Sequence, residues 1–172
     1  SNGHTLGFLC TVNPSPNSGQ HLMFGGGSVI PRIVTTIPLD VSFGGNIDFD
    51  FLMPTQGGPC DGPDYLQEGI MLQYKVAGAT TWSDMPAIQY PFNSNPNPYT
   101  NVAHLSMYTP SIFNAIGSWV QFSIPIPAVA FSDNTQFRWI QTQASSINSD
   151  FWGIDEISVT SNTSLLWSTG DT

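Results

Sequence analysis

The 172-residue sequence predicts an all-β protein whose strands form an antiparallel two-sheet β-sandwich. Short segments in which apolar and polar residues alternate recur along the chain, as expected of strands that bury one face. Clusters of Gly, Pro, Asn and Ser separate these segments and indicate turns. Charged residues make up only 9% of the chain, which is too few to solvate long helices. One short helix is expected at residues 110–116.

Seven strands are expected, each for a local reason. The first is a short apolar run, and the second alternates so that Ile33, Thr35 and Ile37 share one face. In the third (residues 47–51), Ile and two Phe share one face, and in the fourth (residues 68–76), Ile, Leu, Tyr and Val do so. In the fifth (residues 119–126), Val, Phe and two Ile share one face. The sixth (residues 136–141) places Phe and Trp on one face, and the seventh (residues 151–160) places Ile and Val on one face. The expected strands are residues 21–24, 32–41, 47–51, 68–76, 119–126, 136–141 and 151–160.

Two carboxylates are expected on the buried faces of their strands. Glu68 has the parity of the apolar residues in segment 68–76, and Asp155 has the parity of Ile157 and Val159. A buried carboxylate costs several kcal/mol unless it is paired, hydrogen-bonded or bound to a metal ion. Each residue lies near the start of its strand. We therefore predict a site at the rim of the sandwich.

The charge balance excludes several functions. Three Lys and Arg against 12 Asp and Glu give a net charge of −9. So few bases can neither neutralise nucleic-acid phosphates nor form a basic patch for anionic lipid. No apolar run is long enough to span a membrane as a helix. We expect no nucleic-acid partner and no membrane insertion, and the charge-poor composition predicts a secreted or cell-surface protein.

The two cysteines, Cys10 and Cys60, are too few for a zinc site built from thiolates, and no CxxC spacing occurs. In a secreted domain they are expected to form a disulfide. The closed loop would contribute about 4 kcal/mol of stability in the chain-entropy model. The alternative is two separate buried thiols.

Three stretches resemble motifs of reelin subrepeats. Residues 68–75 (EGIMLQYK), followed by the TTW of residues 80–82, resemble an EG-apolar-LQYS run that ends in TW. Residues 137–141 (FRWIQ) resemble an FRWWQ strand, and residues 150–157 (DFWGIDEI) resemble a closing strand D-x-WALDNV. This resemblance implies an extracellular jelly-roll sandwich with a disulfide and bound calcium. A loop rich in Asn and Pro near Tyr90 departs from the family pattern.

Calcium is accordingly the expected cofactor. It takes six to eight oxygen ligands, mixing carboxylates with backbone carbonyls. We predict Asp155 and Glu68 as ligands, with Asp61 and Asp64 of the preceding acidic loop supplying further oxygens. Two alternatives remain open: an ion pair of Glu68 or Asp155 with Arg138, and carboxylates that are hydrogen-bonded without an ion.

Candidate ligand-binding residues lie away from the expected core. Asp48 and Asp50 lie on the face of their strand opposite to its apolar residues. Three interpretations are open: a catalytic acid–base pair, the floor of a sugar-binding surface, or a solvated outer face. Trp119 also lies opposite to the apolar face of its strand and is expected to be exposed. Tyr90 and Tyr99 flank the Asn/Pro-rich loop, which is either a recognition loop or a plain connector.

These patterns predict a non-catalytic, calcium-stabilised binding or adhesion module, with a glycan or a surface protein as ligand. The alternatives are a carbohydrate-binding module of a secreted hydrolase and a glycan-active enzyme that uses Asp48, Asp50 or Glu68. We assign residues 1–160 to this domain. Residues 161–172 resemble a linker and the opening of an immunoglobulin-like repeat, so adjacent domains of the same chain are expected partners.

Overall fold

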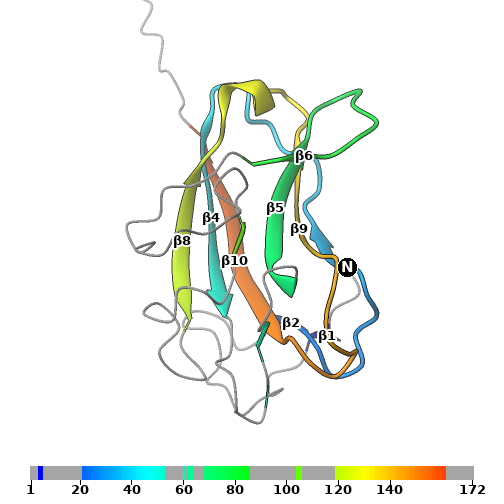
Figure 1. Ribbon diagram of the computed structural model, residues 1–172. Coiled ribbons are helices and arrows are strands. Elements are labelled where there is room, and N and C mark those ends of the chain that lie inside the picture. The colour runs from blue at the N-terminus through cyan, green and yellow to red at the C-terminus, as the bar shows by residue number, and fades with distance from the viewer. Residues whose placement is uncertain are drawn as a thin grey trace, which may run out of the picture.

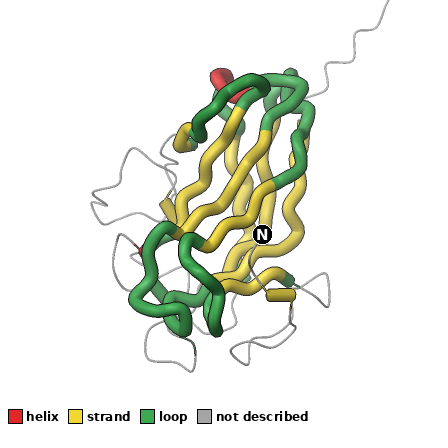
Figure 2. Tube along the Cα trace, turned by 90° about the vertical axis from the view of Figure 1, so that its right-hand side faces the viewer, coloured by secondary structure: helices red, strands yellow, loops and turns green. Residues whose placement is uncertain are grey.

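The computed structural model consists of two antiparallel β-sheets stacked as a sandwich (Figure 1). It describes residues 4–5, 21–52, 60, 62–63, 68–85, 104–105 and 119–161. Sheet A has the strand order β1-β2-β10-β4-β8, and sheet B has the order β3-β9-β5-β6, with β7 also paired to β5. Figure 2 shows the strands running along the length of the molecule, with loops at both ends. The predicted all-β sandwich is confirmed.

The strands are short, as is usual in a sandwich. Those of sheet A are β1 (His4–Thr5), β2 (Leu22–Phe24), β10 (Trp152–Ser161), β4 (Gly45–Leu52) and β8 (Val120–Pro125). Those of sheet B are β3 (Arg32–Thr35), β9 (Gln136–Gln141), β5 (Ile70–Lys75), β6 (Ser83–Asp84) and β7 (His104–Leu105). A 3-10 turn at Ala128–Ala130 joins β8 to β9. The helix expected at residues 110–116 lies outside the described residues.

Strand pairing joins the first half of the chain to the second. β2 pairs with β10, β3 with β9, β4 with β8, and β5 with β7, always antiparallel. From β2 to β5, and again from β8 to β10, successive strands alternate between the two sheets. This is the strand pairing of a jelly roll, in which one long folded ribbon of paired strands wraps into two sheets.

Aromatic rings fill the space between the sheets. Trp152 of sheet A stacks on Phe24 with ring centroids 4.1 Å apart, and Phe49 meets Trp139 of sheet B at 5.0 Å. All four side chains are buried. The expected inward face of β4 is also confirmed, because Ile47, Phe49 and Phe51 belong to this core.

The second expected strand is shorter than predicted and faces the other way. β3 ends at Thr35, and its buried residues are Arg32 and Val34. Ile37, expected on the same face as Ile33, is 75% exposed. Pro38 has no backbone N–H to donate to a sheet, which favours an end to the strand at this point. The buried position of Arg32 is explained by its hydrogen bonds, described below. In the described part of the chain, no helix is long and apolar enough to cross a membrane.

Candidate functional site

Asp155 does not face the core, contrary to the parity prediction. Trp152 and Ile154 are buried, whereas Asp155 is half-buried and lies opposite Asp50 of β4. The register of β10 against β4 shifts between Asp155 and Ser158, and the intervening Glu156 has a φ of 50°. This β-bulge reverses which residues face inward, so the parity of the residues that follow it does not apply to Asp155.

Asp155 instead lies in a row of titratable residues on the outer face of sheet A. Its partner across β4 is Asp50, and the pairing of Ile154 with Leu22 places His21 beside it on the other side. Asp50 is 5% exposed and His21 is 3% exposed. Burial raises the pKa of Asp50, and the charge of Asp155 raises it further. Burial lowers the pKa of His21, and the charge of Asp155 opposes this effect.

Asp48 and Asp50 share the outer face of β4, as predicted, but their surroundings differ. Asp48 is half-buried and accepts a hydrogen bond of 2.7 Å from the Thr160 hydroxyl. Asp50 is buried, so it is not part of a solvated face. The two carboxylates therefore do not form an open pair directed at solvent.

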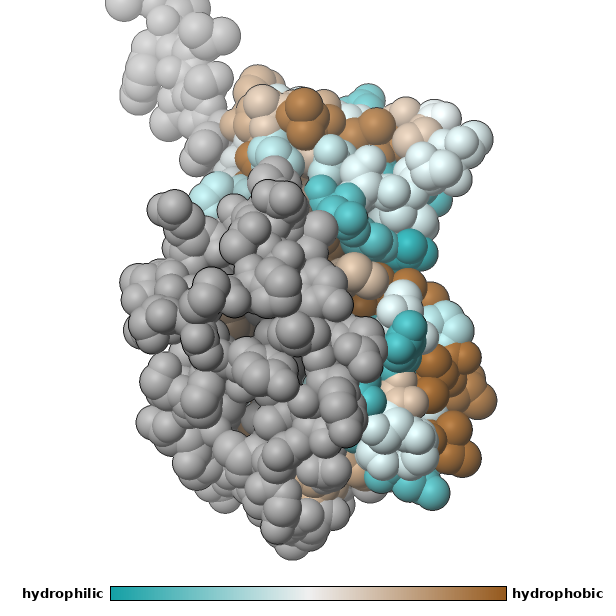
Figure 3. Space-filling view, in the orientation of Figure 1, coloured by the Kyte–Doolittle hydropathy of each residue, from teal (hydrophilic) through white to brown (hydrophobic). Residues whose placement is uncertain are grey.

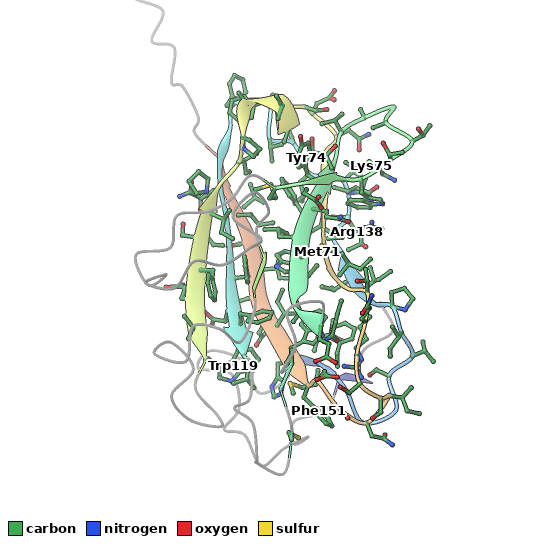
Figure 4. All side chains as sticks on the ribbon, viewed as in Figure 1. Met71, Tyr74, Lys75, Trp119, Arg138 and Phe151 are labelled. Atoms are coloured by element: carbon green, nitrogen blue, oxygen red, sulfur yellow. The ribbon has the colours of Figure 1, made fainter. Side chains whose placement is uncertain are left out.

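Trp119 is half-buried rather than exposed. It packs against a second apolar cluster on the outer side of sheet A, made of Met23, Leu52, Cys60 and Phe151. Its ring also meets His21 edge-on, with centroids 5.1 Å apart. Figure 4 labels Trp119 and Phe151 at one end of the sandwich, remote from Lys75 and Tyr74 at the other. A second core beneath Trp119 could not be inferred from the strand alternation.

Glu68 is buried, as predicted, and it is linked to Asp150 through Ser145 and Gln141. The Ser145 hydroxyl donates to Glu68 Oε1 at 2.7 Å, and the Ser145 backbone N–H donates to Asp150 Oδ2 at 2.5 Å. Gln141 Nε2 donates to the backbone carbonyls of Glu68 at 2.7 Å and of Asp150 at 3.3 Å. Asp150 is fully buried and has a φ of 55°, a conformation that Asp tolerates better than most residues. Glu68, Gln141, Ser145 and Asp150 thus form one site, which we call the Glu68 corner.

Arg32 is the cation of the Glu68 corner. Its Nη1 donates to Gln141 Oε1 at 2.9 Å and to the Asp150 carbonyl at 2.7 Å. Its Nη2 donates to the carbonyls of Ser146 at 3.1 Å and Ile147 at 3.2 Å. The side chain is fully buried, and burial lowers the pKa of Arg32 while the charge of Asp150 opposes that shift.

The alternative in which Arg138 pairs with Glu68 or Asp155 is wrong. Arg138 donates to Gln73 Oε1 at 2.7 Å, and its guanidinium lies 4.3 Å from the ring centre of Trp82. These residues belong to the outer face of sheet B. Glu68 lies on its inner side, and Asp155 belongs to sheet A.

The chemistry of the Glu68 corner suits calcium. Two carboxylates, a hydroxyl and backbone carbonyls are the hard oxygen donors that this ion prefers. No three His, Cys, Asp or Glu side chains in the described ranges lie close enough to hold a metal ion together. Further ligands would have to be carbonyls, water, or Asp61 and Asp64, which lie outside those ranges, as do Tyr90, Tyr99 and Cys10. Cys60 is buried, and its pairing with Cys10 stays a prediction.

Sequence reasoning missed Arg32 and Asp150. Asp150 opens the DFW stretch that resembles the reelin closing strand, and the stretch that begins at Arg32 also follows the reelin pattern. Strand alternation gave no signal for the burial of Arg32, because a buried Arg follows no periodic pattern and is recognised only through its acceptors.

Comparison with known proteins gives two findings. In structure, the chain is similar to a cleaved adhesin domain of Lys-gingipain from Porphyromonas gingivalis. The two share 14% sequence identity with a TM-score of 0.45, and the match covers 84% of this chain and 76% of that one. In sequence, the family model for Reelin subrepeat B matches residues 3–160. The chain therefore belongs to the Reelin subrepeat B family.

Proposed function

We propose that this domain is a non-catalytic, calcium-stabilised binding or adhesion module of a secreted or cell-surface protein. Its membership of the Reelin subrepeat B family and its jelly-roll fold support a binding role. The proposed stabilisation by calcium is supported by the pair of buried carboxylates, Glu68 and Asp150, which are joined through hydrogen bonds from Ser145.

Two carboxylates in one buried corner repel each other and lose hydration. Arg32 offsets part of this cost, yet its four hydrogen bonds go to carbonyl and amide oxygens. A divalent cation would compensate the remaining charge. Asp64 precedes Glu68 by four residues, so the chain allows it to reach the same ion.

Bound calcium would link the two sheets. Glu68 lies two residues before the start of β5 of sheet B, and Asp150 lies two residues before the start of β10 of sheet A. An ion held by both carboxylates would therefore fix the rim where these strands begin. At a calcium concentration of 100 times Kd, binding to the folded state alone adds about 2.7 kcal/mol.

A non-catalytic role is supported by where the acidic candidates lie. Glu68 belongs to the corner between the sheets, whereas Asp48 and Asp50 lie on the outer face of sheet A. Asp50 is buried and Asp48 is bonded to Thr160. The described residues thus offer no acid–base pair that joins Glu68 to either aspartate.

Thermal unfolding in calcium and in EDTA tests this function. Calcium should raise Tm by roughly 5–10 °C near saturation, and Glu68→Gln and Asp150→Asn should lose the effect. Asp155→Asn is the matched control, because it removes an equal charge outside the Glu68 corner. A wild-type Tm that is the same in both solutions would reject calcium. Hydrolysis of a glycan that is abolished by Asp50→Asn would reject the non-catalytic role.

A further inference from the structure

Two of the three strong bases lie together on the outer face of sheet B. Arg32 is buried, whereas Lys75 and Arg138 are each partly exposed. Arg138 of β9 is opposite Gln73 of β5, so Lys75 is its diagonal neighbour two residues along β5. Figure 4 shows both side chains on the same side of the molecule. The face seen in Figure 3 has a hydrophilic band between two hydrophobic areas.

Trp82 holds the two cations in place. The guanidinium carbon of Arg138 is 4.3 Å from its ring centre, and Lys75 Nζ is 5.0 Å from the same centre. Trp82 directly precedes β6, the edge strand of sheet B. A guanidinium resting on an aromatic ring keeps its plane fixed, which lowers the entropy lost when it binds a ligand.

A chain of hydrogen bonds orients Arg138 further. Its Nε donates to Gln73 Oε1 at 2.7 Å, and Gln73 Nε2 donates to Asp84 Oδ1, also at 2.7 Å. Within the described residues, the two Nη groups of Arg138 donate to no acceptor, and Lys75 Nζ has only the contact with Trp82. Two parallel N–H donors of a fixed guanidinium match the two oxygens of a carboxylate.

The charge of this surface fits one anionic group. Lys75 and Arg138 contribute two positive charges, Asp84 contributes one negative charge, and the chain as a whole has a net charge of −9. A long acidic segment would be repelled by the rest of the molecule. Thr80, Thr81 and Ser83, which flank Trp82 in the sequence, are exposed and offer hydroxyl groups. Hydroxyls beside a single carboxylate receptor suit a sugar acid better than a run of acidic residues.

We propose that Arg138, Lys75 and Trp82 form a binding site for the carboxylate of an acidic sugar, a uronic or sialic acid unit of a glycan. This inference rests on the proposed binding function and names its ligand class. Arg138 forms the bidentate contact, Lys75 adds the second charge, and Trp82 fixes both. The exposed hydroxyls of the β5–β6 connection contact the sugar ring.

The test compares 3′-sialyllactose with lactose, which lacks only the sialic acid, and adds trigalacturonate as the uronic acid probe. The calcium-loaded protein is titrated with each sugar and followed by two-dimensional NMR. The two acidic sugars should shift the Trp82 indole resonance, and lactose should not. Arg138→Gln should weaken binding about tenfold or more, because a charge-assisted bidentate contact is lost. Gln143→Glu, an exposed substitution with the same change in net charge, should leave binding unchanged.

Three results would overturn the proposal. The first is acidic-sugar binding that is absent from wild type, or that is unchanged in an Arg138→Gln variant that melts like wild type. The second is tighter binding of a Glu-rich hexapeptide at the same resonances, which would assign the surface to a protein partner. Neutral-glycan binding that survives Arg138→Gln would refute this ligand class and leave the proposed binding function standing. Loss of the calcium effect on Tm concerns the Glu68 corner and is independent of this surface.

Discussion

Arg32→Met removes a buried charge while keeping a side chain of similar length. The guanidinium forms four hydrogen bonds, two to Gln141 and Asp150 and two to the loop carbonyls of Ser146 and Ile147. Met can fill the space but can donate to none of these acceptors. The substitution therefore separates the electrostatic role of Arg32 from its packing.

The cost can be worked out from the acceptors. At about 1 kcal/mol net for each bond, the loss is roughly 4 kcal/mol. Three acceptors keep another donor, namely Trp152 Nε1 on Gln141, Gln141 Nε2 on the Asp150 carbonyl, and Gly27 N on the Ile147 carbonyl. This lowers the expected loss, but the charge of Asp150 loses its buried counterpart. We expect a decrease of about 3–4 kcal/mol in the free energy of unfolding, near the range for breaking a buried ionic partnership.

Urea unfolding followed by tryptophan fluorescence measures this loss. Arg138→Met is the matched control, because it makes the same substitution at a partly exposed site with one hydrogen bond and one ring contact. It should cost about 1–2 kcal/mol. Equal losses in the two variants, or a loss below about 1 kcal/mol in Arg32→Met, would refute the reasoning.

Reduction of the predicted Cys10–Cys60 disulfide should lower the free energy of unfolding by about 4 kcal/mol. Two reactive thiols in the denatured, unreduced chain would contradict the pairing. Asp50→Asn should stabilise the fold at neutral pH, because the raised pKa of Asp50 means that folding disfavours its charged form. Urea melts should show this gain shrinking as pH falls below the raised pKa and vanishing below about 4, where both folded and unfolded Asp50 are protonated. Folding lowers the pKa of His21, so the unfolded chain binds a proton at this side chain more readily than the folded protein does. Wild type should therefore lose stability as pH falls below about 6.5. His21→Phe should lose less stability over the same pH range. Identical profiles of stability against pH for the variant and wild type would count against that interpretation.

Strand alternation was a reliable guide wherever a strand was regular. β9 was expected at residues 136–141 and occurs there, and β4 buries Ile47, Phe49 and Phe51 as predicted. Both strands lie inside their sheets with partners on both sides, so a change of face would expose several large side chains. Alternation is therefore sufficient to predict the buried face where a change of face would expose large side chains along the whole strand.

Alternation failed where the backbone departs from regular geometry. The bulge after Asp155 reversed the face of that residue, and no local pattern around Glu156 signals a positive φ. At the edge of sheet B, Arg32 is buried because loop carbonyls more than 110 residues later in the chain accept its hydrogen bonds. Long-range acceptors of this kind are absent from any local window of sequence.

The candidate site was therefore predicted in part. Glu68 was expected to be buried and in need of partners, and its hydrogen bond with Ser145 agrees. The carboxylate that shares Ser145 with it is Asp150 rather than Asp155, because Asp150 lies two residues before the closing strand, at the rim of the sandwich. The sequence resemblance contained Asp150, but the parity argument did not apply to a residue outside the strand.

The most direct test of the calcium site is an anomalous-difference map from a crystal grown with calcium. The account predicts an ion 2.3–2.6 Å from carboxylate oxygens of both Glu68 and Asp150, the usual calcium–oxygen range. A map with no ion between them, or with an ion bound by Asp155 and Asp50 alone, would contradict it.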